Sequence, residues 1–355
     1  MSIEMANLRV QYAEIKDEVD SAVRGVIENG DFRPGESVIR LENDVAAMCG
    51  AKFGVAVHSG TDAILIALRA AGVRPGDEVV TTPFTFVATT EAIVLAGAVP
   101  VYADIDPDTF NIDPEDIERR ITSKTTAILP VHLYGQCAEM DAIESIASRH
   151  GLKVIYDAAQ AIGAAQNSRR IGETGNAATL SFFPTKNLGA YGDAGMILTN
   201  DEALCEKARL LRVHGMKPGS YYYEDVGYCS RLDELQAAVL LVKLKRLETW
   251  NEKRRQNAAR YFEALSGTPI KAPTVREGRL HTFHQFTICH PRRDDLHDAL
   301  WANGIGSAVY YPLSLHLQPA YRYLGYAEGD FPIAEKAAKE VLSIPVHPEL
   351  TEDQA

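Results

Sequence analysis

Short apolar runs alternate with helical segments from about Phe53 to Asn200, and this alternation constrains the fold more than any other feature of the chain. Several runs are continuously apolar, as expected of strands that are covered on both faces. The segments between them have the periodicity of helices. The pattern predicts an α/β fold with a mostly parallel, doubly wound sheet and crossover helices. The predicted strands are FGVAVHS, DEVVTTP, VPVYADI, TAILPVHLYG, LKVIYDAA, ATLSFFP and GMILTN.

The C-terminal part of the chain has a different organisation. From Leu232 to about Leu265 there is no proline or glycine, which predicts one long helix. We expect this helix to link a large domain, residues 1–245, to a smaller α+β domain, residues 246–355. The large domain includes an N-terminal helical segment. In the smaller one, HTFHQFTICH and IGSAVYYP are typical of strands, and RRDDLHDALWANG between them is typical of a helix.

Composition excludes several classes of protein. A chain of 355 residues is too long for one small core. Its net charge of −12 argues against a nucleic-acid-binding face, and no apolar run approaches the roughly 18 residues of a membrane span. The five cysteines are scattered without a CxxC pair, which fits reduced thiols better than disulfides or a zinc site. We therefore expect a cytoplasmic protein without a metal site, a nucleic-acid partner or a membrane association.

Three loops that follow predicted strands carry the candidate chemistry, because ligands of α/β sheets bind beyond the carboxyl ends of the strands. In the first, Ser59, Gly60 and Thr61 lead from a strand into a helix. The unpaired amides of a helix N-terminus form a seat for a phosphate group. The alternative is plain helix capping by Ser59 or Thr61. No GK[ST] follows, which excludes a Walker A loop, and no GxGxxG occurs, which argues against a dinucleotide site.

The second loop begins with Asp157, at the end of an apolar strand. An unpaired carboxylate is costly there, so Asp157 needs a cationic partner. That partner is a structural arginine, a metal or a protonated ring nitrogen. Gln160, three residues further on, is placed to orient a ligand hydroxyl.

The third loop is SFFPTKNLGAYGDAG, which contains Lys186. Pro184 ends the strand pairing, and Gly189, Gly192 and Gly195 allow tight backbone turns beside the lysine. The alternative interpretation is an ordinary solvated surface lysine. A lysine held at the end of a buried strand can instead have a lowered pKa and act as nucleophile or base.

Together, the three loops indicate pyridoxal 5'-phosphate (PLP). This cofactor has a phosphate for the helix seat, an aldehyde for the amine of Lys186, and a ring nitrogen that Asp157 would keep protonated. Lys186 would hold the cofactor and then move the proton at the substrate carbon. Ser181 could add a hydroxyl to the phosphate site. Phe84 and Phe86 follow another strand and could cover the cofactor ring.

These segments resemble the DegT/DnrJ/EryC1/StrS family of PLP-dependent nucleotide-sugar aminotransferases, over nearly the whole chain. SGTDAILIAL, SRLDELQAAVL and YYPLSLHLQPAY extend the resemblance. It implies the type I, aspartate aminotransferase-like fold, with the large domain as the PLP-binding one. It also implies roles for single residues: Lys186 as the Schiff-base lysine, Asp157 as partner of the ring nitrogen, Gln160 as neighbour of the ring hydroxyl, Phe86 as stacking residue, and Gly60, Thr61 and Ser181 as phosphate ligands.

The resemblance further implies transamination of a nucleotide-linked keto-sugar, with L-glutamate as amino donor, by homodimers that share active sites. The lysine segment is most similar to members that aminate C-3 of dTDP- or UDP-linked sugars. A C-4 aminotransferase is the alternative. A PLP-dependent sugar dehydratase is less favoured because histidine replaces the lysine there, and a non-catalytic regulator of this fold usually lacks catalytic residues or adds a DNA-binding module. An NAD-dependent oxidoreductase is a further alternative, but this chain lacks the glycine-rich fingerprint that such an enzyme needs.

The chain departs from the family pattern at a few positions. Cys229 stands where many relatives have an asparagine that reaches the neighbouring subunit's phosphate. Arg231 remains, and we expect it to contact a substrate phosphate across the dimer. Relatives usually continue beyond the equivalent of Ala355, so we expect the small domain to be incomplete at its end.

A second departure lies in YYPLSLH, where Ser314 replaces a proline that relatives often have. The resemblance implies substrate contacts by Tyr310, Tyr311 and His316 in this segment. The alternative is that the tyrosines are packing residues and that His316 is a hydrogen-bonded core histidine.

Overall fold

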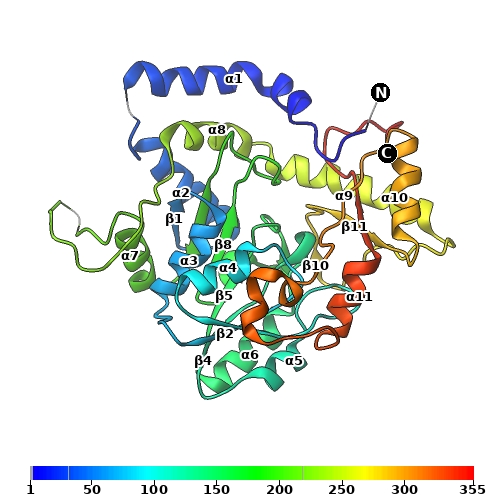
Figure 1. Ribbon diagram of the computed structural model, residues 1–355. Coiled ribbons are helices and arrows are strands. Elements are labelled where there is room, and N and C mark those ends of the chain that lie inside the picture. The colour runs from blue at the N-terminus through cyan, green and yellow to red at the C-terminus, as the bar shows by residue number, and fades with distance from the viewer. Residues whose placement is uncertain (1–2, 31, 218) are drawn as a thin grey trace.

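A seven-stranded sheet forms the centre of the protein (Figure 1). The computed structural model describes residues 3–30, 32–217 and 219–355. The strands lie in the order β1-β9-β8-β5-β4-β2-β3, and β9 runs antiparallel to both of its neighbours whereas the other pairs are parallel. The seven strands predicted between Phe53 and Asn200 are all present, and the mostly parallel sheet is confirmed. Their bounds are β1 Phe53–Val57, β2 Glu78–Thr81, β3 Val99–Tyr102, β4 Thr125–Leu129, β5 Lys153–Asp157, β8 Ala177–Ser181 and β9 Gly195–Thr199.

Helices cover both faces of the sheet, because successive strand residues point to opposite sides. Ala56 joins one apolar cluster, whereas Val55 and Val57 join the other. The first cluster contains residues of α2 (Glu36–Cys49), α5 (Pro114–Arg120), α6 (Met140–His150) and α8 (Glu234–Leu244). The second contains residues of α3 (Gly60–Ala70), α4 (Ala88–Leu95) and α7 (Glu202–Leu211). The architecture is therefore three-layered.

The prediction of a single helix over residues 232–265 is wrong. The structure has α8, a turn at Lys245 and Arg246, and then α9 (Leu247–Leu265). The two helices share a contact with α1 (Leu8–Asn29) through Trp250 of α9 and otherwise pack against different partners. Helix α8 lies between α2 and α1, which crosses above it in Figure 1, whereas α9 packs on the C-terminal core. Arg246 pairs with Glu18 of α1 at the turn.

The C-terminal segment builds a smaller core on the antiparallel pair β11 (Phe286–Cys289) and β12 (Val341–Ile344), with α10 (Arg293–Ala302) and α11 (Pro332–Glu340). The strand predicted over IGSAVYYP is absent. Only isolated bridges form there, Ile3 with Ile305 and Ala308 with Ser343, because the following tyrosines leave the sheet edge to line a cavity. The last residues form a turn. The division at residue 245 stays a prediction.

The remaining elements are short. A three-stranded sheet consists of β10 (Arg279–Leu280), β6 (Ala165–Gln166) and β7 (Arg169–Arg170). The 3₁₀ helices are η1 (Leu133–Gly135), η2 (Ile171–Glu173), η3 (Leu315–Leu317) and η4 (Pro319–Leu324). None of the helices in the described ranges combines the length and the apolar character that crossing a membrane requires.

Candidate active site

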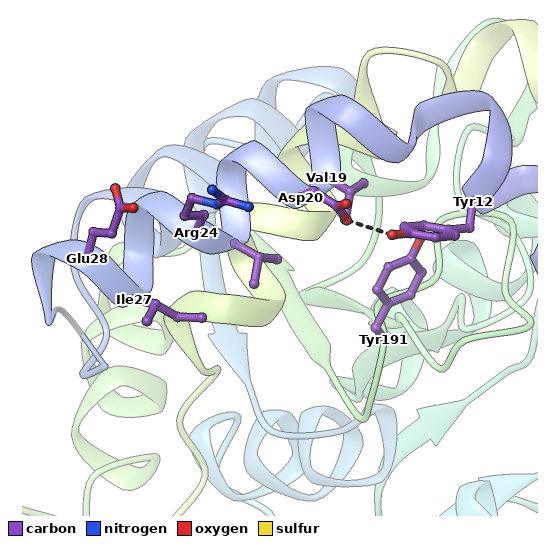
Figure 2. Close-up of a pocket in the computed structure, with 8 residues that line it drawn as sticks. Tyr12, Val19, Asp20, Arg24, Ile27, Glu28 and Tyr191 are labelled. Atoms are coloured by element: carbon purple, nitrogen blue, oxygen red, sulfur yellow. Dashed lines mark hydrogen bonds between the residues drawn. The ribbon is translucent and has the colours of Figure 1, made fainter.

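Two of the cavities in the described part of the chain must be distinguished. An open groove of about 750 Å³ runs along α1 and is shown in Figure 2. Tyr12 donates a 2.6 Å hydrogen bond to Asp20 of the same helix, and the ring of Tyr191 packs edge-on against that of Tyr12. None of the residues predicted to form the active site lines this groove.

The second cavity, of about 580 Å³, lies where β1, β5 and β8 end. Because parallel strands end at one edge of the sheet, loops far apart in sequence meet here. The cavity brings together most of the predicted site residues: Gly60, Thr61, Phe86, Asp157, Gln160, Ser181, Lys186, Tyr310 and Tyr311. We therefore take it as the candidate active site.

One wall of the cavity is the N-terminus of α3. Ser59 caps this helix, since its Oγ accepts a 3.1 Å hydrogen bond from the Asp62 amide. Ser59 thus caps the helix, as the alternative interpretation had it, and Gly60 and Thr61 line the cavity. The phosphate seat stays a prediction. A Cβ atom on Gly60 would lie 2.6 Å from Cβ of Ser181. Only glycine lets α3 approach the end of β8 so closely, and the positive end of the helix dipole suits a phosphate group.

Asp157 is almost fully buried at the end of β5, with 5% of its surface exposed. Its Oδ2 accepts a 2.7 Å hydrogen bond from the Thr89 hydroxyl, and its Oδ1 accepts one of 3.1 Å from the Ala159 amide. In the described part of the chain, no arginine or lysine forms an ion pair with it. Burial raises the pKa of Asp157, whereas the two hydrogen bonds and the charge of Lys186 oppose the rise. A structural arginine is thus not its partner, and a protonated ring nitrogen fits.

Lys186 follows the end of β8 in a turn closed by a 2.8 Å hydrogen bond from its own amide to the Phe183 carbonyl. Its side chain lines the cavity, so it is not a solvated surface lysine. Burial lowers the pKa of Lys186 to about 8, and the carboxylate of Asp157 opposes this change. An amine with this pKa is available in its neutral, nucleophilic form near physiological pH.

Gln160 is fixed at both ends of its amide. Its Oε1 accepts a 2.7 Å hydrogen bond from the Tyr134 amide, and its Nε2 donates one of 3.0 Å to the hydroxyl of Tyr311. Phe86 is 56% exposed and lines the cavity, whereas Phe84 is fully buried. Of the two phenylalanines, Phe86 is therefore the one that can cover a bound ring.

Two predicted substrate residues are not brought to this cavity. Arg231 is exposed, and its Nη2 lies 3.3 Å from Sγ of Cys229. His316 is buried, and its Nε2 lies 3.1 Å from a carboxylate oxygen of Glu335. Its ring packs against Phe331, so it is a core histidine in this chain, as the alternative interpretation had it.

The sequence did not reveal every residue that lines the cavity or supports it. Thr89 holds Asp157, and Asp193, His284 and Gln285 are lining residues. His284 and Gln285 lie in the segment HTFHQFTICH, for which only a strand was predicted. No local motif marks them, because their proximity to Lys186 arises from packing between distant segments.

The residues of this cavity fit PLP. The helix seat at Gly60, the buried carboxylate of Asp157 and the amine of Lys186 match the phosphate, the ring nitrogen and the aldehyde of that cofactor. The tight approach of Gly60 to Ser181 shapes the end of the cavity where such a phosphate would fit.

The chain is similar to several known proteins over most of its length. The chain is 56% identical to the "Pleiotropic regulatory protein" of Geobacillus stearothermophilus, covering all of this chain and 96% of that protein. It is 44% identical to the UDP-N-acetyl-3-dehydro-alpha-D-glucosamine 3-aminotransferase of Acidithiobacillus ferrooxidans, over 99% of this chain and 95% of that one. Identity to the dTDP-3-amino-3,4,6-trideoxy-alpha-D-glucose transaminase of Streptomyces venezuelae is 42%, over 98% and 92% of the two chains.

Several solved structures superpose closely on this chain. The S. venezuelae protein DesV superposes with a TM-score of 0.97 at 41% identity, covering 99% of this chain and 95% of that one. NtdA from Bacillus subtilis, solved with the bound cofactor PMP, superposes with a TM-score of 0.89 at 36% identity, over 96% and 79% of the two chains. A model of the DegT/DnrJ/EryC1/StrS aminotransferase family matches residues 13–355. The chain therefore belongs to the DegT/DnrJ/EryC1/StrS family and is a PLP-dependent sugar aminotransferase.

Proposed function

We propose that this enzyme transfers the amino group of L-glutamate to C-3 of a dTDP- or UDP-linked 3-keto-sugar. The observation that carries the proposal is the pairing of Lys186 and Asp157 in one cavity beside the N-terminus of α3. Two relatives support the carbon and the nucleotides, because their names place the reaction at C-3 of a UDP-linked and of a dTDP-linked sugar.

Each residue has a defined task in this proposal. PLP, when bound, supplies an electron sink for the negative charge that develops at the substrate carbon. Asp157 keeps the ring nitrogen protonated, and Lys186 holds the cofactor and moves the proton at the substrate carbon. With PLP bound, Gln160 would lie beside the ring hydroxyl and Phe86 would cover the ring. The amides and hydroxyls of Gly60, Thr61 and Ser181 would hold the phosphate.

We also propose that the enzyme works as a homodimer, and the charge of the cavity supports this. Lys186 is the one lysine or arginine among the residues that line it. A nucleotide-linked sugar brings a pyrophosphate and glutamate brings two carboxylates, so the substrates need further cations. Arg231 is exposed and forms no ion pair within the described ranges, which makes it the candidate to reach the active site of a second copy. Tyr310 and Tyr311 line the cavity and are the candidate sugar contacts within one chain.

A regulatory role is the second candidate, because one relative is named a pleiotropic regulatory protein. A regulator without catalysis would have no use for a lysine with a lowered pKa that shares a cavity with a buried carboxylate. The two roles differ in turnover, which can be measured directly.

The test is a spectrum followed by a substrate panel. Purified protein is loaded with PLP, and its absorbance is recorded before and after excess L-glutamate. We expect the visible band to be replaced by the band of the amine form. UDP- and dTDP-linked 3-keto and 4-keto sugars are then added, and amino sugars are detected by mass spectrometry. Lys186→Ala is the control. Turnover of the 4-keto sugars alone would overturn the assignment of the reaction to C-3. A spectrum that does not change with glutamate would overturn the assignment of L-glutamate as the amino donor.

A further inference from the structure

His284 lies in the same cavity as Lys186, although the two residues are far apart in the sequence. Nδ1 of His284 lies 3.1 Å from Oδ1 of Asn187, the residue that follows Lys186. A neutral imidazole carries its hydrogen on either nitrogen, so this contact alone does not identify the donor. The surroundings of Asn187 do.

The orientation of the Asn187 amide is fixed by a backbone carbonyl. Its Nδ2 donates to the carbonyl oxygen of Thr282 over 3.0 Å and to Oδ1 of Asn251 over 2.8 Å. Asn251 is oriented in the same way, because its Nδ2 donates to the carbonyl oxygen of Ile162 over 3.2 Å. A carbonyl oxygen only accepts hydrogen bonds, so the group of Asn187 that faces His284 is the amide oxygen. It follows that Nδ1 of His284 carries the hydrogen and donates it.

The other ring nitrogen, Nε2, then has a free lone pair. Burial lowers the pKa of His284 well below its ordinary value, and the charges of Lys186 and of Arg254 on α9 add to this, so the ring is neutral. Within the described residues, buried nitrogens without a partner include Nδ1 of His316 and Nε2 of His132, but not Nε2 of His284. This atom therefore remains accessible from the cavity that the ring lines.

Both side chains line the cavity, and no hydrogen bond joins them in the described structure. We propose that His284 is a positioning residue that Asn187 holds in the Nδ1-protonated form, so that Nε2 accepts a hydrogen bond from the free amine of Lys186 when that amine swings across the cavity. The proposal rests on the role proposed above for Lys186. That amine must remain beside the reacting carbon in its charged and in its neutral form. An acceptor stabilises the charged form and opposes the effect of burial, as the carboxylate of Asp157 on β5 also does.

Two substitutions of His284 distinguish the role of Nδ1 from the role of Nε2. In His284→Asn the shorter amide occupies the place of Nδ1, so the contact with Asn187 is kept and the acceptor in the cavity is lost. In His284→Gln the longer side chain places an amide oxygen near the former position of Nε2, so an acceptor is kept. Thermal unfolding of both variants checks that they fold.

The first measurement is the pH midpoint for covalent attachment of PLP to the cofactor-free protein. We expect His284→Asn to lower the midpoint by roughly one pH unit, because a hydrogen bond to a charged group has about that effect. His284→Gln should keep the midpoint near the wild-type value. An unchanged midpoint in His284→Asn, or an equal fall in both variants, would overturn the proposal.

The second measurement needs no cofactor. Two-bond ¹H–¹⁵N spectra of protein with labelled histidine rings, compared with those of His284→Gln, identify the protonated nitrogen of His284. Hydrogen on Nδ1 is the expected result, and hydrogen on Nε2 would overturn the proposal. If wild-type protein attaches no PLP at any pH, the role proposed for Lys186 is wrong, and the acceptor role of His284 falls with it even where the ring spectrum shows the expected tautomer.

Discussion

Lys243 of α8 donates a 2.7 Å hydrogen bond from Nζ to the carbonyl oxygen of Gly189, three residues beyond Lys186. Lys243 is fully buried, and its Nζ lies 4.3 Å from the centre of the Tyr191 ring. No carboxylate of the described chain lies within ion-pairing distance of it. A buried amine without a close counter-ion thus supports the loop that carries the proposed catalytic lysine.

This arrangement predicts an unusual pH dependence of stability. Burial lowers the pKa of Lys243 to about 8, against 10.5 for a free lysine, while the charge of Glu349 opposes the change. Between these two values the unfolded chain binds the proton and the folded chain does not, so the free energy of unfolding rises with pH in this window. Below pH 8 the folded and the unfolded chain both bind the proton, so Lys243 no longer makes the free energy of unfolding depend on pH.

Lys243→Met is the variant that checks this prediction. The difference in the free energy of unfolding between wild type and variant should change in favour of the wild type by roughly 3 kcal/mol from pH 8 to pH 10.5. Urea unfolding at several pH values measures it. A difference that does not vary with pH would show that Lys243 titrates normally.

The lowered pKa of Lys186 predicts how the cofactor-free protein takes up PLP. The neutral amine is the nucleophile, so the rate of covalent attachment should rise about tenfold per pH unit below pH 8 and level off above it. Stopped-flow absorbance follows the reaction, and Lys186→Ala gives the background. A rate that still rises beyond pH 10 would mean that the amine has its ordinary pKa.

Asp157→Asn tests the buried carboxylate. The amide has the same shape and can keep a hydrogen bond with Thr89, but it cannot hold a ring nitrogen protonated. We expect PLP to bind and kcat to fall by about 10²-fold or more. Thr89→Val is the matched control, since it removes one hydrogen bond and leaves the charge, and its loss should be smaller. Equal losses would assign Asp157 a purely structural task.

The close approach of Gly60 on α3 to Ser181 on β8 leads to a prediction about the phosphate seat. Gly60→Ala places a Cβ atom 2.6 Å from Cβ of Ser181, so the end of the helix must move away from β8. A shift of this kind costs about 1–3 kcal/mol, and we expect PLP affinity to fall roughly tenfold or more. Gly25→Ala is the control, because its Cβ would have no neighbour within 4 Å on α1. Equal PLP affinity in the two variants would contradict the tight seat.

The sequence was sufficient for the sheet and for the residues at the strand ends. Gly60, Asp157 and Lys186 each follow an apolar strand, and a parallel sheet brings such positions to one edge. The break between α8 and α9 could not be predicted, because residues 232–265 favour helix throughout and the turn lets the later part of α9 pack on the C-terminal core. His284 was missed for a similar reason, since its contact with Asn187 joins segments that share no local pattern.

Arg231 gives the sharpest test of a shared active site. If it acts across a dimer, Arg231→Ala should raise KM for the nucleotide sugar and leave PLP attachment to Lys186 intact, because the residue lies outside the cavity of its own chain. Lys186→Ala alone should have no turnover. When the two variants are unfolded, mixed and refolded together, half of the sites in a mixed dimer combine an intact Lys186 with an intact Arg231 of the other chain. Activity with low KM should then return. Mixtures in which no activity with low KM appears would show that Arg231 does not act across the dimer, and the exposed arginine would need another explanation.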